Sequence, residues 1–520
     1  MNFNIPLRCS CIGHARRRYF GSTPTSILPK LSFDRKKWPS TVSSNKKLVD
    51  LDNLEQEFVG AGVKYIAPSF IDMHGIPKAK MVPIHGDHGL YSCSRGSEMF
   101  TGAAVDGVPQ AISDDEVCAV ADPASLCVQL PHRKDVCYVP ASLYYHGTQF
   151  EPCSRNIYSR VAQRAKEMGF MMKLGIEAEF FVLRDSDDVD EMRKQEPFCS
   201  LENLHKPCYD LSRLIDNMPW MSDLVDSMNE LGYDVYSFDH EDAVGQFEVD
   251  FRFDEAALMS DKFVLLRMLL CSIVREHGCY ASWMPKPMKS RTGNGGHLNI
   301  SLHDFDTEEN LFKPAAPIDG SENDGDAERH LSELGRHFLG GVMAHIDAIV
   351  AVSCPTVNSY KRMVWTPPPT SEEETSGFSW APVVASYGAN NRTNAIRIPA
   401  PGRFEIRSCD SAVNPHLASA LVLAAGLHGI ENQLDPGPSR GHDNLYQSAT
   451  TTTDNSNDGL KLLPRDLGEA IHAFENDPLT KAVFGDRMYE SWLKFKKTEW
   501  NDYCKHVSDW EVERYLRQFG

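Results

Sequence analysis

Residues 286–301 read KPMKSRTGNGGHLNIS, and the second half of this stretch alternates in polarity. His297, Asn299 and Ser301 fall on one side of the alternation, and the leucine and isoleucine between them fall on the other. A period of two is typical of a β-strand with one polar and one apolar face. The Gly-rich run at 293–296 leaves room for a ligand to approach the backbone N–H groups. The stretch therefore predicts a strand beside a ligand, although most Gly-rich turns before strands bind nothing.

Three further stretches alternate in the same way, namely KLGIEAEFFVL (173–183), GQFEVDF (245–251) and GRFEIRS (402–408). Their polar positions are Glu177 and Glu179, then Glu248 and Asp250 with Glu241 upstream, and finally Arg403, Glu405 and Arg407. Each apolar face is suited to burial, so each polar face must be solvated or line a charged cavity. Four such strands carrying acids, a histidine and arginines favour a cavity for metal and phosphate over independent surface strands.

The composition is that of a globular protein of two or more domains. The chain has 520 residues, of which 42% are hydrophobic and 24% are charged. The net charge of -19 disfavours nucleic acid as a general partner, although local arginines and metals could still bind ATP. Fourteen cysteines without a CxxC pair disfavour structural zinc and a disulfide framework. The longest apolar stretches, 337–351 and 417–430, are interrupted by His345, Asp347 and His428, so no membrane span is expected.

The N-terminal segment has the composition of a transit peptide. Residues 1–33 contain no Asp or Glu but include Arg8 and the run Arg16 to Arg18, together with several Ser and Thr. Organelle-targeting leaders share this composition. We expect residues 1–45 to be a transit peptide or disordered leader. Mitochondrial import is favoured, and a chloroplast or cytoplasmic location is the alternative.

The rest of the chain divides into two predicted domains. Residues 46–150 should form a small, mostly β domain with a helix at 48–58 and strands at 63–70, 78–83, 117–121, 126–130 and 136–138. Residues 151–520 should form a larger domain of helices and strands. Its helices are expected at 155–168, 220–231, 262–277, 331–352, 415–430 and within 467–518, where Trp492, Trp500 and Trp510 would be packing anchors. The polar segments 303–329 and 439–459 are expected to be insertions.

The stretch 286–301 resembles the ATP-binding signature of the glutamine synthetase family at every constrained position. Further similar motifs occur in the family's order, namely GIEAEFF, HEDAVGQFE, NSYKR, NNRTNAIRIP, GRFEIR and NPHLASALVLAAGLHGI. The resemblance extends from about residue 60 to the C-terminus and is similar to bacterial-type members related to glutamate-methylamine ligase. It implies an α+β fold, with an N-terminal β-grasp domain at 46–150 and a catalytic domain at 151–520. The catalytic domain would hold a curved antiparallel sheet flanked by helices.

The resemblance also implies two divalent ions in each site. The ligands of the first ion, beside the amino acid substrate, would be Glu179, Glu241 and Glu248. The ligands of the second ion, beside the nucleotide phosphates, would be Glu177, His297 and Glu405. Five carboxylates and one imidazole form an oxygen-rich set that suits Mg²⁺ or Mn²⁺, whereas zinc or copper would favour more His and Cys.

Further roles follow from the same resemblance. The arginines that would neutralise the transferred phosphoryl group and the ATP tail are Arg392, Arg397 and Arg403. The groups that would clamp the carboxylates of L-glutamate are the Gly293 backbone, Arg362 and Arg407. The signature residues expected to contact the nucleotide are Lys286, Asn299 and Ser301, beside Arg397 and Arg403. Arginine suits these roles because its planar fork pairs with carboxylate and phosphate oxygens.

The implied reaction is ATP-driven activation of a carboxylate. The γ-phosphoryl group would pass to glutamate, an amine would attack the acyl phosphate, and a flap at 364–380 would exclude water. The implied assembly is a homo-oligomer of stacked rings, a dodecamer, in which the small domain completes a neighbouring subunit's site. No nucleic acid or membrane partner is expected.

Two positions depart from the pattern of ammonia-using members. Those members carry an Asp in an FDGSS-like loop and a Glu before an Ala-Pro pair in the flap, whereas this chain has Phe100 to Ala104 (FTGAA) and Trp380. An alkylamine could therefore replace ammonia, unless the acids at 372–374 substitute for the missing carboxylates. A non-catalytic nitrogen-sensing or structural relative, and a ligase or kinase for another amino acid, remain alternatives. The retained ligands argue against the first, and Arg362 and Arg407 argue against the second.

Overall fold

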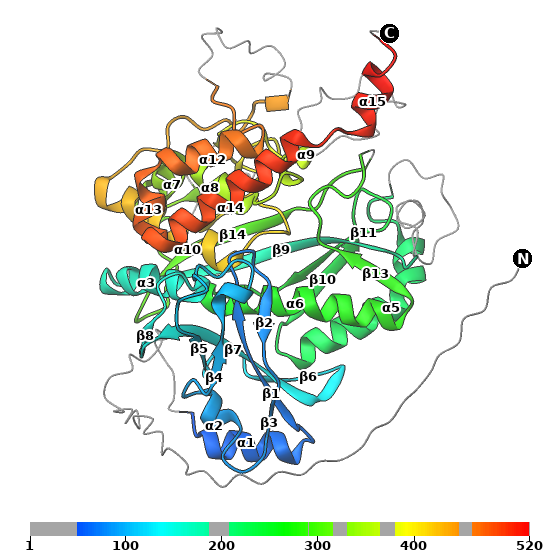
Figure 1. Ribbon diagram of the computed structural model, residues 1–520. Coiled ribbons are helices and arrows are strands. Elements are labelled where there is room, and N and C mark those ends of the chain that lie inside the picture. The colour runs from blue at the N-terminus through cyan, green and yellow to red at the C-terminus, as the bar shows by residue number, and fades with distance from the viewer. Residues whose placement is uncertain are drawn as a thin grey trace, which may run out of the picture. The chain divides into compact units, whose positions relative to one another are not determined.

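The computed structural model describes residues 49–186, 207–289, 291–315, 330–363, 380–446 and 460–518 (Figure 1). The expected leader at 1–45 lies outside these residues, as do flap positions 364–379 with Glu372, Glu373 and Glu374. Parts of both expected insertions also lie outside them.

The first part of the described chain forms an eight-stranded sheet with the central order β2-β1-β7-β5-β4 (Figure 1). Its strands are β1 (Tyr65–Ile71), β2 (Pro77–Ala79), β3 (Val82–Pro83), β4 (Glu98–Phe100), β5 (Val117–Ala121), β6 (Val128–Leu130), β7 (Arg133–Tyr145) and β8 (Thr148–Gln149). The helices of this part are α1 (Leu51–Gly60) and α2 (Leu90–Cys93), followed by a 3-10 turn at Gly102–Ala104. The Asp50 side chain caps α1, and Leu54 and Phe58 pack the helix against the sheet core. The mostly β character expected for this part is confirmed.

The second sheet is curled, has nine strands and carries the alternating polar stretches. Its order is β10-β11-β9-β14-β17-β16-β15, with β12 and β13 also paired to β9. The strands are β9 (Phe170–Arg184), β10 (Val235–His240), β11 (Gln246–Phe251), β12 (Asp254–Glu255), β13 (Cys279–Ser282), β14 (Gly296–Asp304), β15 (Tyr387–Gly388), β16 (Ile396–Ala400) and β17 (Arg403–Ile406). The pairs are antiparallel as predicted, except that β15 is parallel to β16. The intervening loop turns at Asn391, whose Oδ1 accepts from the Thr393 N–H at 3.0 Å.

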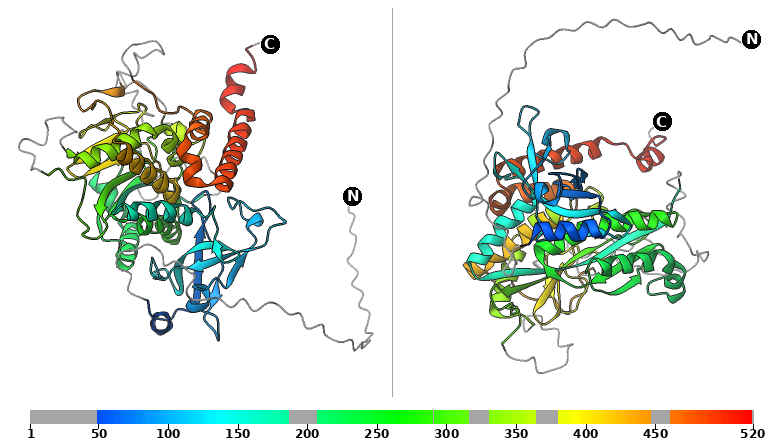
Figure 2. Two further views of the ribbon diagram at one scale, coloured as in Figure 1. Left: turned by 90° about the vertical axis from the view of Figure 1, so that its left-hand side faces the viewer. Right: turned by 90° about the horizontal axis from the view of Figure 1, so that it is seen from below.

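Helices cover the apolar face of this sheet, as the two views of Figure 2 show. The helices of this second part of the chain are α3 (Ser154–Glu167), α5 (Leu211–Glu230), α6 (Ala256–Glu276), α7 (Glu333–Ala344), α8 (Ile346–Ser353), α9 (Ser359–Arg362), α10 (Pro415–Asn432), α12 (Leu467–Asn476), α13 (Pro478–Phe484), α14 (Asp486–Lys505) and α15 (Asp509–Tyr515). Phe180 of β9 meets Trp220 of α5 edge to face, with ring centroids 6.3 Å apart. The apolar side of each ligand strand is therefore fixed in the core, which fixes the direction of its polar side.

The single helix predicted over 331–352 is wrong, because the chain breaks between α7 and α8 at His345. The His345 imidazole lies 2.7 Å from Asp477 Oδ2 and 3.0 Å from the ring of His428, and its backbone leaves helical geometry. Close packing on α10 also constrains α7, since a Cβ at Gly341 would lie 2.0 Å from the Ala425 carbonyl oxygen. Long-range contacts thus end a helix whose local sequence would continue it.

The helical C-terminal region is confirmed, as four helices. Asp477 and Pro478 begin α13, and Gly485, in the left-handed region at φ 75°, separates α13 from α14. Trp492 is buried and Trp500 packs against the core, as expected. Trp510 is 54% exposed, so its predicted role as a packing anchor is wrong. The short helix α15 buries none of its residues, which leaves this tryptophan without a core to fill.

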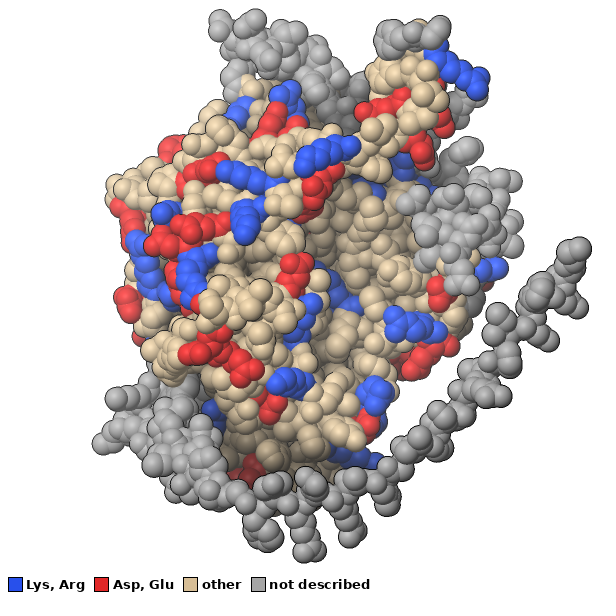
Figure 3. Space-filling model, viewed as in Figure 1, with Lys and Arg blue, Asp and Glu red and all other residues tan. Residues whose placement is uncertain are grey.

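Two further findings bear on partners. No helix among the described residues has both the length and the apolar character to cross a bilayer. On the face shown in Figure 3, the described Lys and Arg side chains are interspersed with Asp and Glu. Such mixing gives no continuous basic area on this face for a nucleic acid backbone.

Candidate active site

Strand register brings the polar faces of the four predicted strands into one row. Glu248 of β11 pairs with Glu179 of β9, and Glu177 of β9 pairs with His297 of β14. The next pairs along the row are Asn299 with Glu405 of β17, and Glu405 with Arg397 of β16. Directly paired side chains share a face, so five neighbouring strands build one continuous polar surface.

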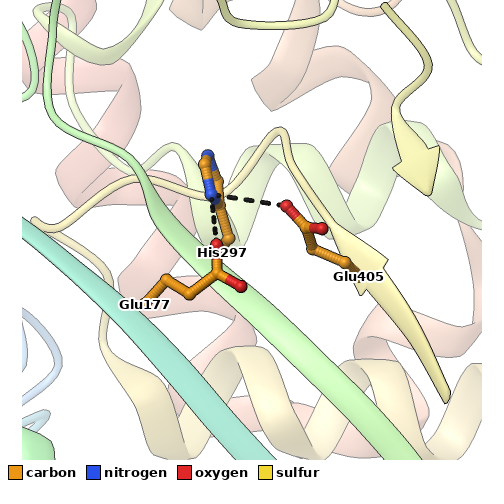
Figure 4. A group of neighbouring side chains, drawn as sticks. All are labelled: Glu177, His297 and Glu405. Atoms are coloured by element: carbon orange, nitrogen blue, oxygen red, sulfur yellow. Dashed lines mark hydrogen bonds and ion pairs between the residues drawn. The ribbon is translucent and has the colours of Figure 1, made fainter. Parts of the chain in front are cut away.

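The acids of this surface form two compact clusters. Glu177, His297 and Glu405 make one, in which His297 Nδ1 lies 3.0 Å from Glu177 and 3.5 Å from Glu405 (Figure 4). The members of the other are Glu179, Glu241 and Glu248. In each cluster one ligand atom per residue lies within 4.8 Å of the others. The structure thus brings together the two predicted ligand sets, each as a separate group.

The electrostatics of the first predicted cluster fit a divalent cation. Burial and the neighbouring carboxylate of Glu179 raise the pKa of Glu241 to about 8 and that of Glu248 well above its ordinary range. Three crowded carboxylates resist full ionisation unless a positive charge lies among them. A hard cation such as Mg²⁺ or Mn²⁺ would supply that charge, and oxygen is its preferred ligand.

In the second cluster, hydrogen-bonding groups already contact the Glu177 carboxylate. Burial opposes ionisation of Glu177, but the His297 ring and the Asn299 amide outweigh it and lower the pKa of Glu177 to about 2. The Asn299 Nδ2 group donates to Glu177 at 2.8 Å, and Arg403 donates to the Asn299 side-chain oxygen. Asn299 therefore joins this cluster to a predicted phosphate-binding arginine.

Glu405 is fully buried between two arginines. Arg397 Nη1 lies 3.1 Å from one of its oxygens, and Arg407 Nη1 donates to the other at 2.6 Å. Both arginines also line the cavity beside the clusters. Glu405 thus fixes two guanidinium groups where an anionic substrate would lie.

Five of the six cluster residues, namely Glu177, Glu179, Glu241, Glu248 and His297, line one cavity of about 950 Å³. The remaining predicted site residues that line it are Gly293, Ser301, Arg362, Arg392 and Arg403. Arg392 is exposed at its edge. Lys286 is not among the lining residues, because its ammonium group turns away and donates to the Arg291 carbonyl. Glu405 does not line the cavity either, because it is fully buried behind Arg397 and Arg407. The structure therefore places every predicted site residue except Lys286 and Glu405 on the cavity wall.

Arg362 has the surroundings of an anion clamp. Its guanidinium is buried and donates to the carbonyls of Ser408 at 3.0 Å and Arg407 at 3.1 Å. Within the described ranges, no carboxylate lies within 4.0 Å of it. Gly293 adjoins Arg362, and a Cβ added at Gly293 would lie 2.3 Å from the Pro285 carbonyl oxygen. A buried charge beside bare backbone suits a ligand carboxylate.

Comparison with known proteins agrees with this geometry. Residues 151–515 match the family model described as glutamine synthetase, catalytic domain. The chain belongs to the glutamine synthetase family. It is 36% identical over 472 residues to a glutamine synthetase of Rhizobium meliloti (strain 1021), covering 90% of this chain and 99% of that protein. It is also 36% identical over 458 residues to the glutamate-methylamine ligase of Methyloversatilis universalis, covering 88% and 97%.

A solved structure described as a GmaS/ADP complex shares this fold. Its TM-score is 0.77 at 31% identity, and the match covers 90% of this chain and 100% of that one. The predicted family is confirmed, and this glutamine synthetase family member is an ATP-dependent ligase. The family uses ATP and divalent metals, which agrees with the two acidic clusters.

Several residues around the cavity of this ligase were not predicted from the sequence. Gln246, Tyr209 and Asp239 line it but were not assigned, and Asp250 was noted only as part of a polar face. Burial raises the pKa of Asp239 to about 6 and of Asp250 to about 7, with nearby carboxylates adding to the effect. Gln246 sits within the HEDAVGQFE motif, a signal that could have identified it. Tyr209 gives no local signal, since its position depends on a backbone at φ 63°.

The raised pKa of Glu241 predicts a pH-dependent stabilisation by metal. The folded, metal-free ligase keeps a proton on Glu241 up to about pH 8, whereas the ordinary value is 4.5, so rising pH between these values lowers the free energy of unfolding. A cation binds the deprotonated cluster. We therefore expect the gain in Tm from Mn²⁺, measured by scanning calorimetry after chelation, to be larger at about pH 8 than at about pH 6. Glu241→Gln should reduce this difference, and an equal gain at both pH values would contradict the prediction.

Proposed function

We propose that this ligase uses ATP to form an amide on the γ-carboxylate of L-glutamate, as a glutamine synthetase does. One observation carries the proposal. A buried Arg362 beside the Gly293 backbone opens on the same cavity as two acidic clusters and three further arginines, Arg397, Arg403 and Arg407. An amino acid carboxylate would bind at the first group, and the triphosphate would bind at the second. The metals proposed are Mg²⁺ or Mn²⁺, two in each site.

The reaction would proceed in two steps. First, the side-chain carboxylate of glutamate attacks the γ-phosphorus, the bond to the β-phosphate oxygen breaks, and ADP leaves. Arg397 and Arg403 offset negative charge on the transferring group, and bound divalent ions would add to that neutralisation. Second, an amine attacks the acyl carbon of γ-glutamyl phosphate, loses a proton, and releases phosphate. The cavity must exclude water during this interval, because an acyl phosphate hydrolyses readily.

The nucleophile is ammonia or a small alkylamine, and one observation favours the alkylamine. Trp380 occupies the position where ammonia-using relatives carry a carboxylate, and it lines the cavity together with Tyr209 and Cys208. Its indole N–H lies 3.3 Å from Asp242 Oδ2, which holds the ring near the acids. An aromatic side chain offers apolar contact to an alkyl group. It attracts an ammonium ion less strongly than the carboxylate of the ammonia-using relatives would. Similarity to a glutamate-methylamine ligase supports the same choice.

Phosphate release tests the function and the amine together. We expect the purified chain with Mg²⁺-ATP and glutamate to release phosphate only when an amine is added. The kcat/KM for methylamine should exceed that for ammonium by about 10-fold or more, since one methyl group in an apolar pocket is worth about 1–3 kcal/mol. Trp380→Glu should lower the ratio of the kcat/KM for methylamine to that for ammonium, and Trp380→Phe should leave this ratio unchanged.

Each alternative gives a distinct result in this assay. A higher kcat/KM for ammonium than for every alkylamine would make the protein a glutamine synthetase in the strict sense. No release with any amine, from folded protein that binds ATP and Mn²⁺, would favour a non-catalytic relative or another acid substrate.

We further propose a ring-shaped homo-oligomer, a dodecamer, in which a β-grasp domain at residues 46–150 completes the neighbouring site. Apolar side chains exposed on this part of the chain support the proposal, since Met81, Met99 and Ile112 would be covered by a neighbour.

The acid-free segment 1–33 supports mitochondrial import. Light scattering of the purified chain tests the oligomeric state, and imaging of a tagged full-length protein tests the mitochondrial location.

A further inference from the structure

Gln246 is hydrogen-bonded to two acids of the first metal cluster and lies two residues before the third. Its Nε2 group donates to Glu179 Oε2 at 3.0 Å, and its carbonyl accepts from the Glu241 N–H at 2.9 Å. Glu248 follows two residues later on the same strand, β11. The turn that leads into the strand needs Gly245 at φ 80°, where a Cβ would lie 3.1 Å from the Val182 carbonyl. The local backbone is therefore shaped to bring Gln246 among the ligands.

The same side chain also reaches the predicted glutamate clamp. Its Nε2 group lies 3.1 Å from the Gly293 carbonyl and 3.3 Å from the Asn294 side-chain oxygen. Its Oε1 accepts from the Thr292 hydroxyl at 2.8 Å and from the Ala243 N–H at 3.2 Å. Gln246 is 1% exposed, so water does not compete for these bonds. One amide thus joins the Gly-rich loop to a metal ligand.

We propose that Gln246 is a positioning residue that couples the first metal cluster to the glutamate clamp. The inference rests on the proposed function, because it takes glutamate to bind beside Gly293. A neutral amide suits the position because it offers donors to a carboxylate and a carbonyl while accepting from a hydroxyl and an N–H. A carboxylate would add a further negative charge beside Glu179, and an apolar side chain would leave several buried groups unsatisfied.

The second cluster provides an internal comparison. Its side chains are held by contacts that do not involve Gln246, namely His297 to Glu177 at 3.0 Å and the two arginines on Glu405. Ser411 supports the first cluster through the backbone only, since its hydroxyl lies 2.7 Å from the carbonyls of Glu179 and Gly295. Loss of Gln246 should therefore weaken the first metal site and glutamate binding, and should leave the nucleotide-side metal site unchanged.

Gln246→Met tests the inference, because methionine keeps the volume and removes the hydrogen bonds. Gln129→Met is the matched control, since Gln129 also donates to two carbonyls, those of Ala61 and Lys134, away from the cavity. Mn²⁺ is titrated into the metal-free full chain and followed by electron paramagnetic resonance. We expect the affinity of one of two sites to fall by about 10- to 100-fold in Gln246→Met, and neither site to change in Gln129→Met.

Kinetics and a second variant complete the test. The KM for glutamate should rise by about 10-fold, and the KM for ATP should change by less than about twofold. Gln246→Asn keeps the amide but shortens it, and its effect on Mn²⁺ affinity should be intermediate. Equal weakening of both metal sites, or no change in either site, would overturn the inference. The Mn²⁺ titration needs no turnover, so it can succeed even if the wild-type chain makes no amide and the proposed function fails.

Discussion

Replacing Glu405 by glutamine should nearly abolish ligation and should also destabilise the fold. Glu405 is fully buried and holds Arg397 and Arg407, and removal of its charge leaves the buried Arg407 and the partly buried Arg397 without their anion. Breaking a buried ion pair costs about 3–5 kcal/mol of unfolding free energy. Loss of a residue that only supports a metal ligand lowers metal affinity or activity by about 10- to 100-fold. Glu405 is itself a predicted ligand, so its replacement should lower kcat/KM by about 100-fold or more. Denaturant unfolding and the phosphate release assay measure the two effects.

Glu469→Gln is the matched control for this variant. Glu469 also pairs with an arginine, Arg465 at 2.6 Å, but this pair lies on the surface. Exposed pairs contribute about 0–1 kcal/mol, so stability and activity should change little. If Glu405→Gln retained full activity and stability, Glu405 would be neither the metal ligand nor the anchor of the arginines.

Arg362→Lys should raise the KM for glutamate with a much smaller effect on the KM for ATP. Arg362 is buried, and its fork is fixed by the carbonyls of Ser408 and Arg407, so a bound carboxylate would meet a preset donor geometry. A lysine keeps the charge but cannot reproduce the fork. Hydrogen bonds to charged groups contribute about 1.5–3 kcal/mol, which corresponds to roughly a 10- to 150-fold higher KM for glutamate.

Arg487→Lys serves as the control for that substitution. Arg487 donates to the Pro109 carbonyl and to Asp114 at 3.0 Å each, in an exposed position outside the cavity. Its kinetic constants should match those of the wild-type chain. A normal KM for glutamate in Arg362→Lys would place the glutamate carboxylate elsewhere in the cavity.

Much of the fold was predictable because each ligand strand carries a period-two pattern. Glu177 and Glu179 oppose Ile176, Ala178 and Phe180 in the sequence, and the latter three are buried in the structure. Pattern alone could not reveal the break at His345, because that break depends on Asp477 and His428, which lie far along the chain. Nor could it reveal that Trp510 lies on a helix without a core beneath it.

The site was predictable to the extent that residue type indicates chemistry. The two metal clusters contain carboxylates and an imidazole, which the strand pattern and the family motifs could identify. Gln246 was missed because an amide has no charge to signal a role, and its importance comes from contacts across the Gly-rich loop. Lys286 belongs to the signature, but its side chain turns toward Arg291, a direction that sequence spacing cannot give.

The fixed register of the polar row has a consequence for how this protein can change in length. Glu248, Glu179, Glu177, His297 and Glu405 lie on neighbouring strands, and each stays on the polar face of the sheet only because the alternation keeps its phase. Inserting one residue into any of these strands would turn the following side chains from the cavity into the core, and a ligand with them. Insertions and deletions should therefore be tolerated only in the connecting loops, so evolution can lengthen the chain between the ligand strands but not within them.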